Sequence, residues 1–179
     1  QDVPTLGRFG AVREIPFHAG LNLVSMPLSV DVASGRPAAA SDLAAALAAA
    51  FVVRFQADPA GHLRPVPYLP GTASSDFTLE PAAGYLVSTP KALLLRLQGT
   101  AWGFDSVTRK LIRGLLPLSL PHGVPPGTTV RGLLSTLGLE FGVVSEAAPG
   151  SQRGRLRLFF ADGRTGSGDL PLTTGTALL

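Results

Sequence analysis

An internal repeat of 90 residues is the feature that most constrains how this chain folds. When the sequence is shifted by 90 residues without gaps, ten positions between residues 21 and 60 are identical. They are Leu21, Pro27, Leu28, Ser29, Leu43, Leu47, Phe51, Val53, Ala57 and Pro59, which fall on Leu111, Pro117, Leu118, Ser119, Leu133, Leu137, Phe141, Val143, Ala147 and Pro149. Leu43, Leu47 and Phe51 recur every four residues, which is the spacing of one face of a helix. The pattern predicts two related units.

Each unit is expected to contain several short antiparallel strands and one short helix. In the first unit we predict strands over 12–17, 21–30, 51–56, 63–69, 84–87 and 93–97, and a helix over 42–50 with Ser41 as its N-cap. In the second we predict strands over 111–120, 141–145, 155–160 and 176–179, and a helix over 129–139. The 21 glycines and 16 prolines favour such short elements joined by turns. The expected fold is mainly β (α+β), with two tandem pseudo-symmetric repeats packed as a sandwich or barrel.

The boundary between the two units is expected within residues 98–106. This divides the chain into a first β-rich repeat, 1–99, and a second, shorter one, 100–179. A unit of about 90 residues buries little surface on its own. We therefore expect the two repeats to pack together as one unit.

Composition indicates a chain with a hydrophobic core and an unusually uncharged surface. Hydrophobic residues make up 45% of the chain and charged residues 15%, against roughly a quarter charged in ordinary domains. Cysteine is absent, which excludes disulfides and thiolate metal sites. No apolar run approaches the ~20 residues of a membrane-spanning helix. The chain begins at Gln1, which fits removal of a signal peptide, so we expect an extracellular or cell-surface protein.

Charge is divided unevenly between the two halves. Residues 1–90 hold five arginines and seven acids, for a net charge of −2, whereas residues 91–179 hold ten basic residues and five acids, for +5. The basic residues are dispersed and lack an aromatic platform, so we expect no nucleic-acid partner. Arg153, Arg155 and Arg157 alternate along a strand and are expected on its solvent face. Halves of opposite sign favour head-to-tail association of copies of the chain.

The segment from His18 to Leu28 resembles a repeat module of large bacterial and archaeal secreted and cell-surface proteins. In that module the motif reads Gly-Trp-Asn-Leu-Val/Ile-Ser-Leu-Pro, followed by a Gly-Tyr-Trp-Val segment and a closing strand that ends in Gly. Here the second part is similar to Gly84-Tyr85-Leu86-Val87 and the third to Leu93 through Gly99. The resemblance covers residues 12–99, and the second copy is degenerate. Leu21 and Leu86 replace the two tryptophans. The resemblance implies an extracellular structural or binding role and carries no catalytic residues.

No residue pattern predicts an enzyme, a cofactor or a metal site. His18, His62 and His122 are expected in turns or loops and share no metal-ligand spacing. Gly166-Ser167-Gly168 lacks the spacing of a nucleophile elbow, and no phosphate-binding glycine loop with a lysine is present. The loop from Asp162 to Asp169 supplies oxygen donors, so calcium binding stays open beside a plain hairpin loop.

Four residues are candidates for contact with a ligand or another subunit. Trp102, with Tyr85 beside it, could stack on a sugar, although a tryptophan between two repeats is more often a core or interface plug. Phe159 and Phe160 are adjacent on a strand and must face opposite sides, so Phe160 is the candidate to face another sheet or subunit. Leu178 belongs to an apolar C-terminal segment.

The expected function is that of a non-catalytic extracellular structural subunit. We expect it to self-associate into a fibre, sheath or surface layer, in the sharpest version by exchange of a terminal strand between copies. Deletion of residues 1–10 would then abolish assembly and leave a soluble fold. The alternative is a carbohydrate-binding or adhesion module of a secreted protein.

Overall fold

Short antiparallel strands dominate the computed structural model, which describes residues 3–58, 60, 63–72, 76–81, 83–102, 118–119, 127–147, 154–164, 168–172 and 177–178. The elements in chain order are β1 (Thr5–Leu6), β2 (Ala11–Phe17), β3 (Gly20–Ser25), β4 (Leu28–Ser29), α1 (Ala40–Leu47), β5 (Phe51–Ala57), β6 (Leu63–Tyr68), β7 (Gly84–Thr89), β8 (Leu93–Ala101), β9 (Leu118–Ser119), α2 (Val130–Leu137), β10 (Phe141–Ala147), β11 (Gly154–Phe160) and β12 (Ala177–Leu178). The expectation of a mainly β fold is confirmed. Neither of these helices is long and apolar enough to span a membrane.

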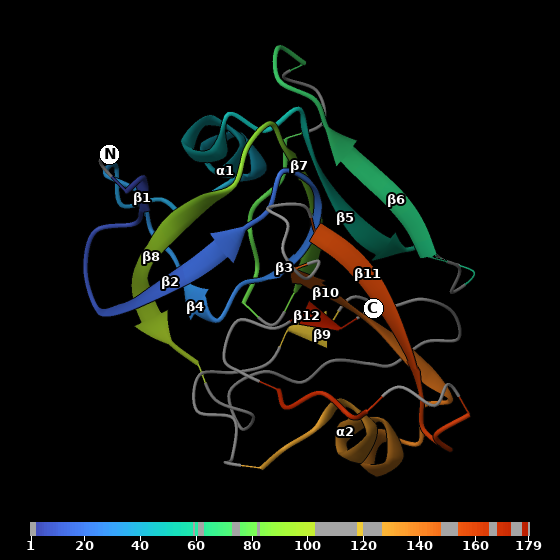
Figure 1. Ribbon diagram of the computed structural model, residues 1–179. Helices are drawn as coiled ribbons and strands as arrows, with labels where there is room; N and C mark the ends of the chain where they lie inside the picture. Colours follow the sequence, from blue (N-terminus) through green and yellow to red (C-terminus); the bar gives the residue numbers. More distant parts are fainter. Residues whose placement is uncertain are drawn as a thin grey trace.

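The strands form three sheets of four strands (Figure 1). The β8 sheet has the order β1-β8-β2, and β4 also pairs with β8. The β7 sheet has the order β3-β7-β5-β6, and the β10 sheet the order β9-β12-β10-β11. All pairs are antiparallel except β1 with β8. None of the three sheets closes into a barrel in the described part of the chain, so the barrel form of the prediction is wrong there.

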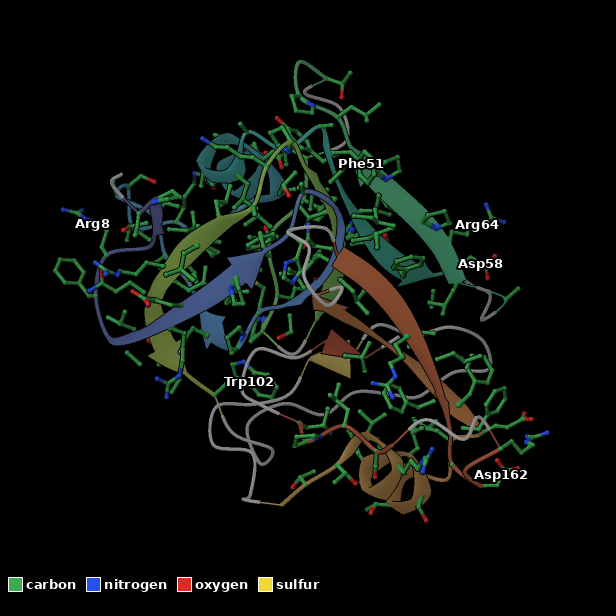
Figure 2. All side chains as sticks on the ribbon, in the orientation of Figure 1. Arg8, Phe51, Asp58, Arg64, Trp102 and Asp162 are labelled. Atoms are coloured by element: carbon green, nitrogen blue, oxygen red, sulfur yellow. The ribbon has the colours of Figure 1, made fainter. Side chains whose placement is uncertain are left out.

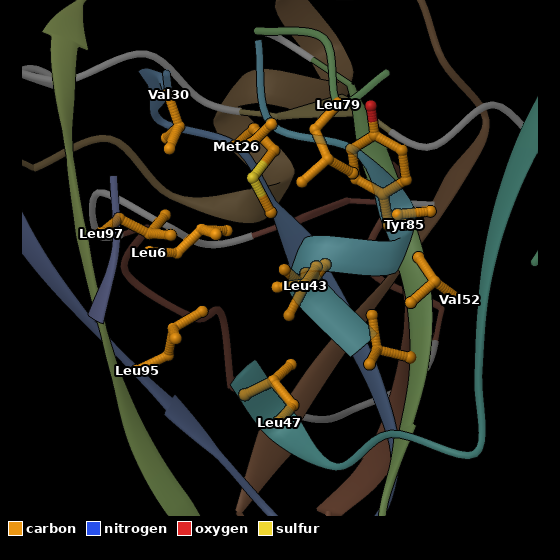
Figure 3. Close-up of a cluster of buried hydrophobic side chains, with 14 of the residues drawn as sticks. Leu6, Met26, Val30, Leu43, Leu47, Val52, Leu79, Tyr85, Leu95 and Leu97 are labelled. Atoms are coloured by element: carbon orange, nitrogen blue, oxygen red, sulfur yellow. The ribbon is translucent and has the colours of Figure 1, made fainter. Parts of the chain in front are cut away.

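The main hydrophobic core lies between the β8 sheet, the β7 sheet and α1 (Figure 3). Leu43 and Leu47, which the four-residue spacing placed on one helix face, are both buried in it. Leu95 and Leu97 of β8 and Val52 of β5 reach the same core from the two sheets. The first half of the chain therefore folds by closing two sheets over one helix.

A buried amide fastens the corner where the chain passes between these two sheets. The chain leaves the β8 sheet at the end of β2 and enters the β7 sheet at β3, with His18 and Ala19 between them. The Asn22 Oδ1 atom accepts a hydrogen bond from the His18 amide at 2.8 Å, and its Nδ2 donates to the His18 carbonyl at 2.8 Å and to Gly20 at 3.1 Å. Nδ2 also lies 3.2 Å from the Thr89 hydroxyl, which donates to the His18 carbonyl at 2.7 Å. Since Thr89 ends β7, just before the chain returns to β8, Asn22 joins both crossings.

One helix and one strand of the second half repeat the positions of elements in the first half. α2 and β10 begin and end 90 residues after α1 and β5. The residues after the two helices, Ala48 and Gly138, both adopt left-handed conformations, with φ of 50° and 65°, and donate their amides back to helix carbonyls. Aspartates from a later segment accept hydrogen bonds from amides of the two first turns: Asp76 from Ser41 at 3.1 Å, and Asp169 from Arg131 at 3.1 Å.

Three features of the observed chain differ from those expected. α1 begins at Ala40, because the Ser41 hydroxyl donates to Asp76 at 2.6 Å instead of capping the helix, and Asp42 accepts the Ala39 amide at 2.7 Å. The predicted division after residue 99 falls inside β8, which pairs with β4 as far as Ala101. The predicted strand over 21–30 is broken into β3 and β4, which belong to different sheets.

Removal of the side-chain amide of Asn22 should destabilise the first half. Asn22→Ala leaves the half-buried His18 amide without its acceptor, while the His18 carbonyl keeps the Thr89 hydroxyl, so we expect the free energy of unfolding to fall by about 1–3 kcal/mol. Urea denaturation followed by circular dichroism measures this. Gln56→Ala is the control, because Gln56 is exposed and its side chain accepts one hydrogen bond, from Arg54, among the described residues. Equal stability of the two variants would contradict the role given to Asn22.

Matched leucines should report how differently the two helices are buried. Leu47 and Leu137 lie 90 residues apart, yet Leu47 is 1% exposed and Leu137 is 38% exposed. Leu47→Ala should lower the free energy of unfolding by about 2–5 kcal/mol, and Leu137→Ala by less than about 1 kcal/mol. Guanidinium titrations of both variants test this, and comparable losses would refute the difference in burial.

Candidate interaction surface

The outer face of strands β10 and β11 carries apolar side chains that are only partly covered. The two strands pair antiparallel over seven positions, with Phe141 opposite Phe160 and Val143 opposite Leu158. The phenylalanine rings lie 6.1 Å apart between centroids. Phe141 is 39% exposed and Leu158 is 40% exposed, whereas Val143 and Phe160 are partly buried. We call these four residues the β10–β11 face.

The opposite side of the same strands faces α2. Val144 and Phe159 are buried there with Val130 and Leu134 of α2 and with Leu172. Among the described side chains, this second core consists of these five buried residues. The apolar side chains of β10 and β11 that point away from α2 are therefore not part of it.

Charged side chains border the β10–β11 face at one end. The Arg164 guanidinium lies 4.7 Å from the centre of the Phe160 ring, and bonds Asp162 at 2.6 Å and Glu140 at 3.2 Å. The pKa of Asp162 is lowered, mainly by the hydrogen bond from the Arg164 amide and further by the hydrogen bond and positive charge of the Arg164 guanidinium. The rim is thus an ionised cluster beside an apolar face, an arrangement typical of protein interfaces.

Strand β11 is also one of the two edge strands of its sheet, with β9 at the other end, and no described strand pairs with its outer side. The Ala161 amide donates to the Glu140 carbonyl at 3.0 Å, and since hydrogen-bonded pairs alternate in an antiparallel ladder, Leu158 directs its backbone N–H away from β10. The edge strand of the β7 sheet, β6, has prolines at positions 65 and 67, opposite Phe55 and Val53. Prolines on an edge block the addition of another strand. β11 contains none.

The two aromatic candidates for sugar stacking are buried. The Trp102 indole donates to the Met26 carbonyl at 2.9 Å. The Tyr85 hydroxyl accepts the Glu80 amide at 2.7 Å, and its ring stacks on Phe77. Figure 2 places Trp102 at the foot of the β8 sheet, next to the second half. Trp102 and Tyr85 therefore occupy core positions, and neither presents an open ring face.

The other two candidates lie in the β10 sheet. Phe160 lies on the side of β11 opposite the buried Phe159, as predicted for adjacent strand residues. Leu178 pairs with Val144 and with Leu118 within the sheet. The expectation that arginines line the solvent face of β11 is wrong for Arg157, which stacks 4.9 Å over the Phe159 ring on the α2 side.

Phe141 and Leu158 are the surface residues that sequence reasoning missed. The repeat match at Phe141 does not show whether that side chain is exposed. The alternation of arginine and leucine in β11 was used only to assign the arginines to a face. That alternation identifies two faces correctly but does not show which face α2 covers.

Hydrogen bonding accounts for both aspartates of the loop once considered for calcium. Asp162 bonds Arg164, and Asp169 accepts the amides of Arg131 and Leu170. Partial burial acts to raise the pKa of Asp169, but hydrogen bonds from Thr129 and from these amides outweigh it and lower the pKa. Residues 165–167 lie outside the described part. The described residues contain no group of three or more potential metal-binding side chains.

Two cavities of about 110 and 210 Å³ lie in the first half. Both are smaller than the roughly 300–1,000 Å³ typical of sites for drug-sized ligands. Of the three histidines, His18 is half-buried at the corner between β2 and β3, and His62 and His122 fall outside the described residues.

Asp169 should contribute stability that acid removes. Its folded-state pKa is lowered, so the contribution is present above the unfolded pKa of about 3.9 and is lost as pH falls through the folded value. Asp169→Asn should cost about 0.5 kcal/mol at pH 7, allowing for solvent screening, and nearly nothing at pH 2. Urea titrations at both pH values test this. Asp31→Asn is the control, and an equal cost for Asp169→Asn at the two pH values would contradict the assignment.

Comparison of the chain with protein-family models, with curated proteins and with solved structures finds no match. The β10–β11 face joins two exposed apolar side chains, Phe141 and Leu158, to an edge strand of the described sheet.

Proposed function

We propose that the chain is a non-catalytic structural subunit, built from two related halves, that self-associates through strand β11. The observation that carries this proposal is the combination of an open edge and an exposed apolar face on one strand. Leu158 contributes to both, with an outward backbone N–H and a side chain that is 40% exposed. A second strand added at this edge would gain backbone hydrogen bonds and apolar contact together.

The relation between the two halves is supported by their matching sheets. The β7 sheet runs β3-β7-β5-β6, and the β10 sheet runs β9-β12-β10-β11. In the first, Arg54 of β5 opposes Tyr85 of β7, and in the second Val144, 90 residues after Arg54, opposes Leu178 of β12. Strand β3 lies against β9, β10, β11 and β12. We propose that the halves are tandem repeats packed as a sandwich around β3.

The association is proposed to be head to tail. Arg155 and Arg157 recur along β11, so antiparallel pairing of β11 with its own copy would place like charges near each other, which is unfavourable. The first half has a net charge of −2 and the second half +5. An edge of the first half of the next copy is therefore the better partner. Such a heterologous contact does not close on itself and grows a filament.

Edge addition is favoured here over exchange of the N-terminal strand. Residues Thr5 and Leu6 pair with Arg96 and Leu97 of the same chain, and Leu6 is buried in the main core. Release of β1 would uncover that core, so deletion of residues 1–10 would harm the fold as well as any assembly. Addition of a strand at the β11 edge does not require the release of β1.

An extracellular or cell-surface location is part of the proposal. It rests on the resemblance of residues 12–99 to modules of secreted proteins. Asn22, the asparagine of that motif, has a structural role as the corner fastener, which is consistent with a module that supplies architecture.

Blocking the edge with proline should abolish assembly. Leu158 opposes Val143 in β10, and Pro67 opposes Val53 in β5, which lies 90 residues before Val143. Leu158→Pro therefore copies a proline that the edge strand of the first half already carries. We expect wild type to form oligomers or filaments by light scattering after gel filtration and by electron microscopy. Leu158→Pro should be monomeric with an unchanged circular dichroism spectrum.

Two further variants test whether a loss of assembly comes from the blocked edge or from the loss of an exposed leucine. Leu158→Ala keeps the backbone N–H and removes apolar area, so its assembly should be weakened but retained. Leu69→Ala changes an exposed leucine of the first half and should assemble as wild type does. A monodisperse wild-type monomer of 18.5 kDa, or full assembly by Leu158→Pro, would overturn the proposal.

A further inference from the structure

A groove in the first half combines an exposed aromatic ring with unpartnered oxygen atoms. It has a volume of about 210 Å³ and lies between the turn from β1 to β2 and the segment that follows β4. We call it the Phe9 groove; its lining includes Arg8, Phe9, Ser29, Asp31, Gly99 and Thr100. Figure 2 shows Arg8 beside β1, on the opposite side of the view from β11.

The walls of the Phe9 groove are held in place by backbone contacts. The Val32 amide donates to the Arg36 carbonyl at 2.9 Å, and the Gly35 amide donates to Val32 at 2.8 Å, which closes a tight turn on one side. The Arg8 guanidinium donates to the Ala33 carbonyl at 2.7 Å and so ties the opposite wall to this turn. Gly99 forms part of the floor, where a Cβ atom would collide with the carbonyl of Ser29.

The aromatic ring of the groove is open to solvent. Phe9 is 76% exposed, the largest value among the exposed large hydrophobic residues of the described chain. The Arg8 guanidinium lies 5.3 Å from the centre of the ring. The Phe9 ring is outside the described core, and its open face is available to stack on a ligand.

The oxygen atoms of the groove are available as hydrogen-bond partners. No described residue donates a hydrogen bond to the Asp31 carboxylate, and the hydroxyls of Ser29 and Thr100 have no side-chain hydrogen bond within the described chain. An ionised carboxylate accepts hydrogen bonds and donates none. A ligand rich in hydroxyl groups would match it, since each hydroxyl donates one.

We propose that the Phe9 groove binds one neutral sugar residue of a polysaccharide. A pyranose ring has a face of C–H groups, which suits the Phe9 ring, and an edge of hydroxyls, which suits Asp31, Ser29 and Thr100. The volume is that of a site for a small ligand rather than a drug-sized one. An anionic ligand would be repelled by Asp31, and Arg8 already bonds Ala33.

Saturation-transfer NMR with four methyl glycosides, those of glucose, mannose, galactose and N-acetylglucosamine, tests this site. We expect transfer to at least one of them, with affinity reduced about tenfold or more in Phe9→Ala and in Asp31→Asn. Both residues are exposed, so both variants should keep the wild-type melting temperature. Leu69→Ala is the matched control for loss of an exposed apolar side chain elsewhere and should bind as wild type does.

The outcomes separate this inference from the proposed self-association. Leu158→Pro should bind the sugar unchanged, because β11 is not part of the groove. Absence of transfer to all four glycosides would overturn the inference, as would equal binding by wild type and Phe9→Ala. Neither result bears on whether β11 assembles.

Discussion

The hydrogen bonds of the Asn22 side chain are the constraint on which the first half depends. Two sheets can share a core only if the chain crosses between them twice, and both crossings meet at this amide. With the corner fixed, α1 contacts β1 and β8 of one sheet and β5 of the other. Burial of Leu43 and Leu47 then follows from the geometry. The extended motif from His18 to Leu28 can thus be understood as a folding signal.

The two halves use similar elements but treat their surfaces differently. Proline at positions 65 and 67 ends the first sheet at β6, whereas arginine and leucine alternate in the matching strand β11. Both halves expose large apolar side chains, Phe9 and Leu69 in the first and Phe141 and Leu158 in the second. The difference lies in the edge strands, because β6 carries prolines and β11 does not. The Phe9 groove lies in the first half, where backbone contacts hold its walls.

Local patterns in the sequence predicted local structure well. The 90-residue match placed α1 and α2 within two residues of their starts, and the adjacency of Phe159 and Phe160 predicted their opposite faces. Long-range contacts were beyond such reasoning. Asp76 and Asp169 bond the first turns of helices some 35 residues or more away in sequence, and no spacing rule identifies them. Trp102 was expected more often as a core or interface residue than on a sugar, but its acceptor, the Met26 carbonyl 76 residues away, could not be identified from the sequence.

The left-handed residues that end the two helices carry a consequence for the history of the chain. Glycine tolerates this conformation at Gly138, but Ala48 holds the same conformation with a side chain, at a cost of roughly 1 kcal/mol. Such a cost persists only where surrounding interactions outweigh it, and α1 places Leu43 and Leu47 in the main core. If the halves descend from one ancestor, one helix end has the glycine that this conformation favours, and the other holds the same conformation with a side chain.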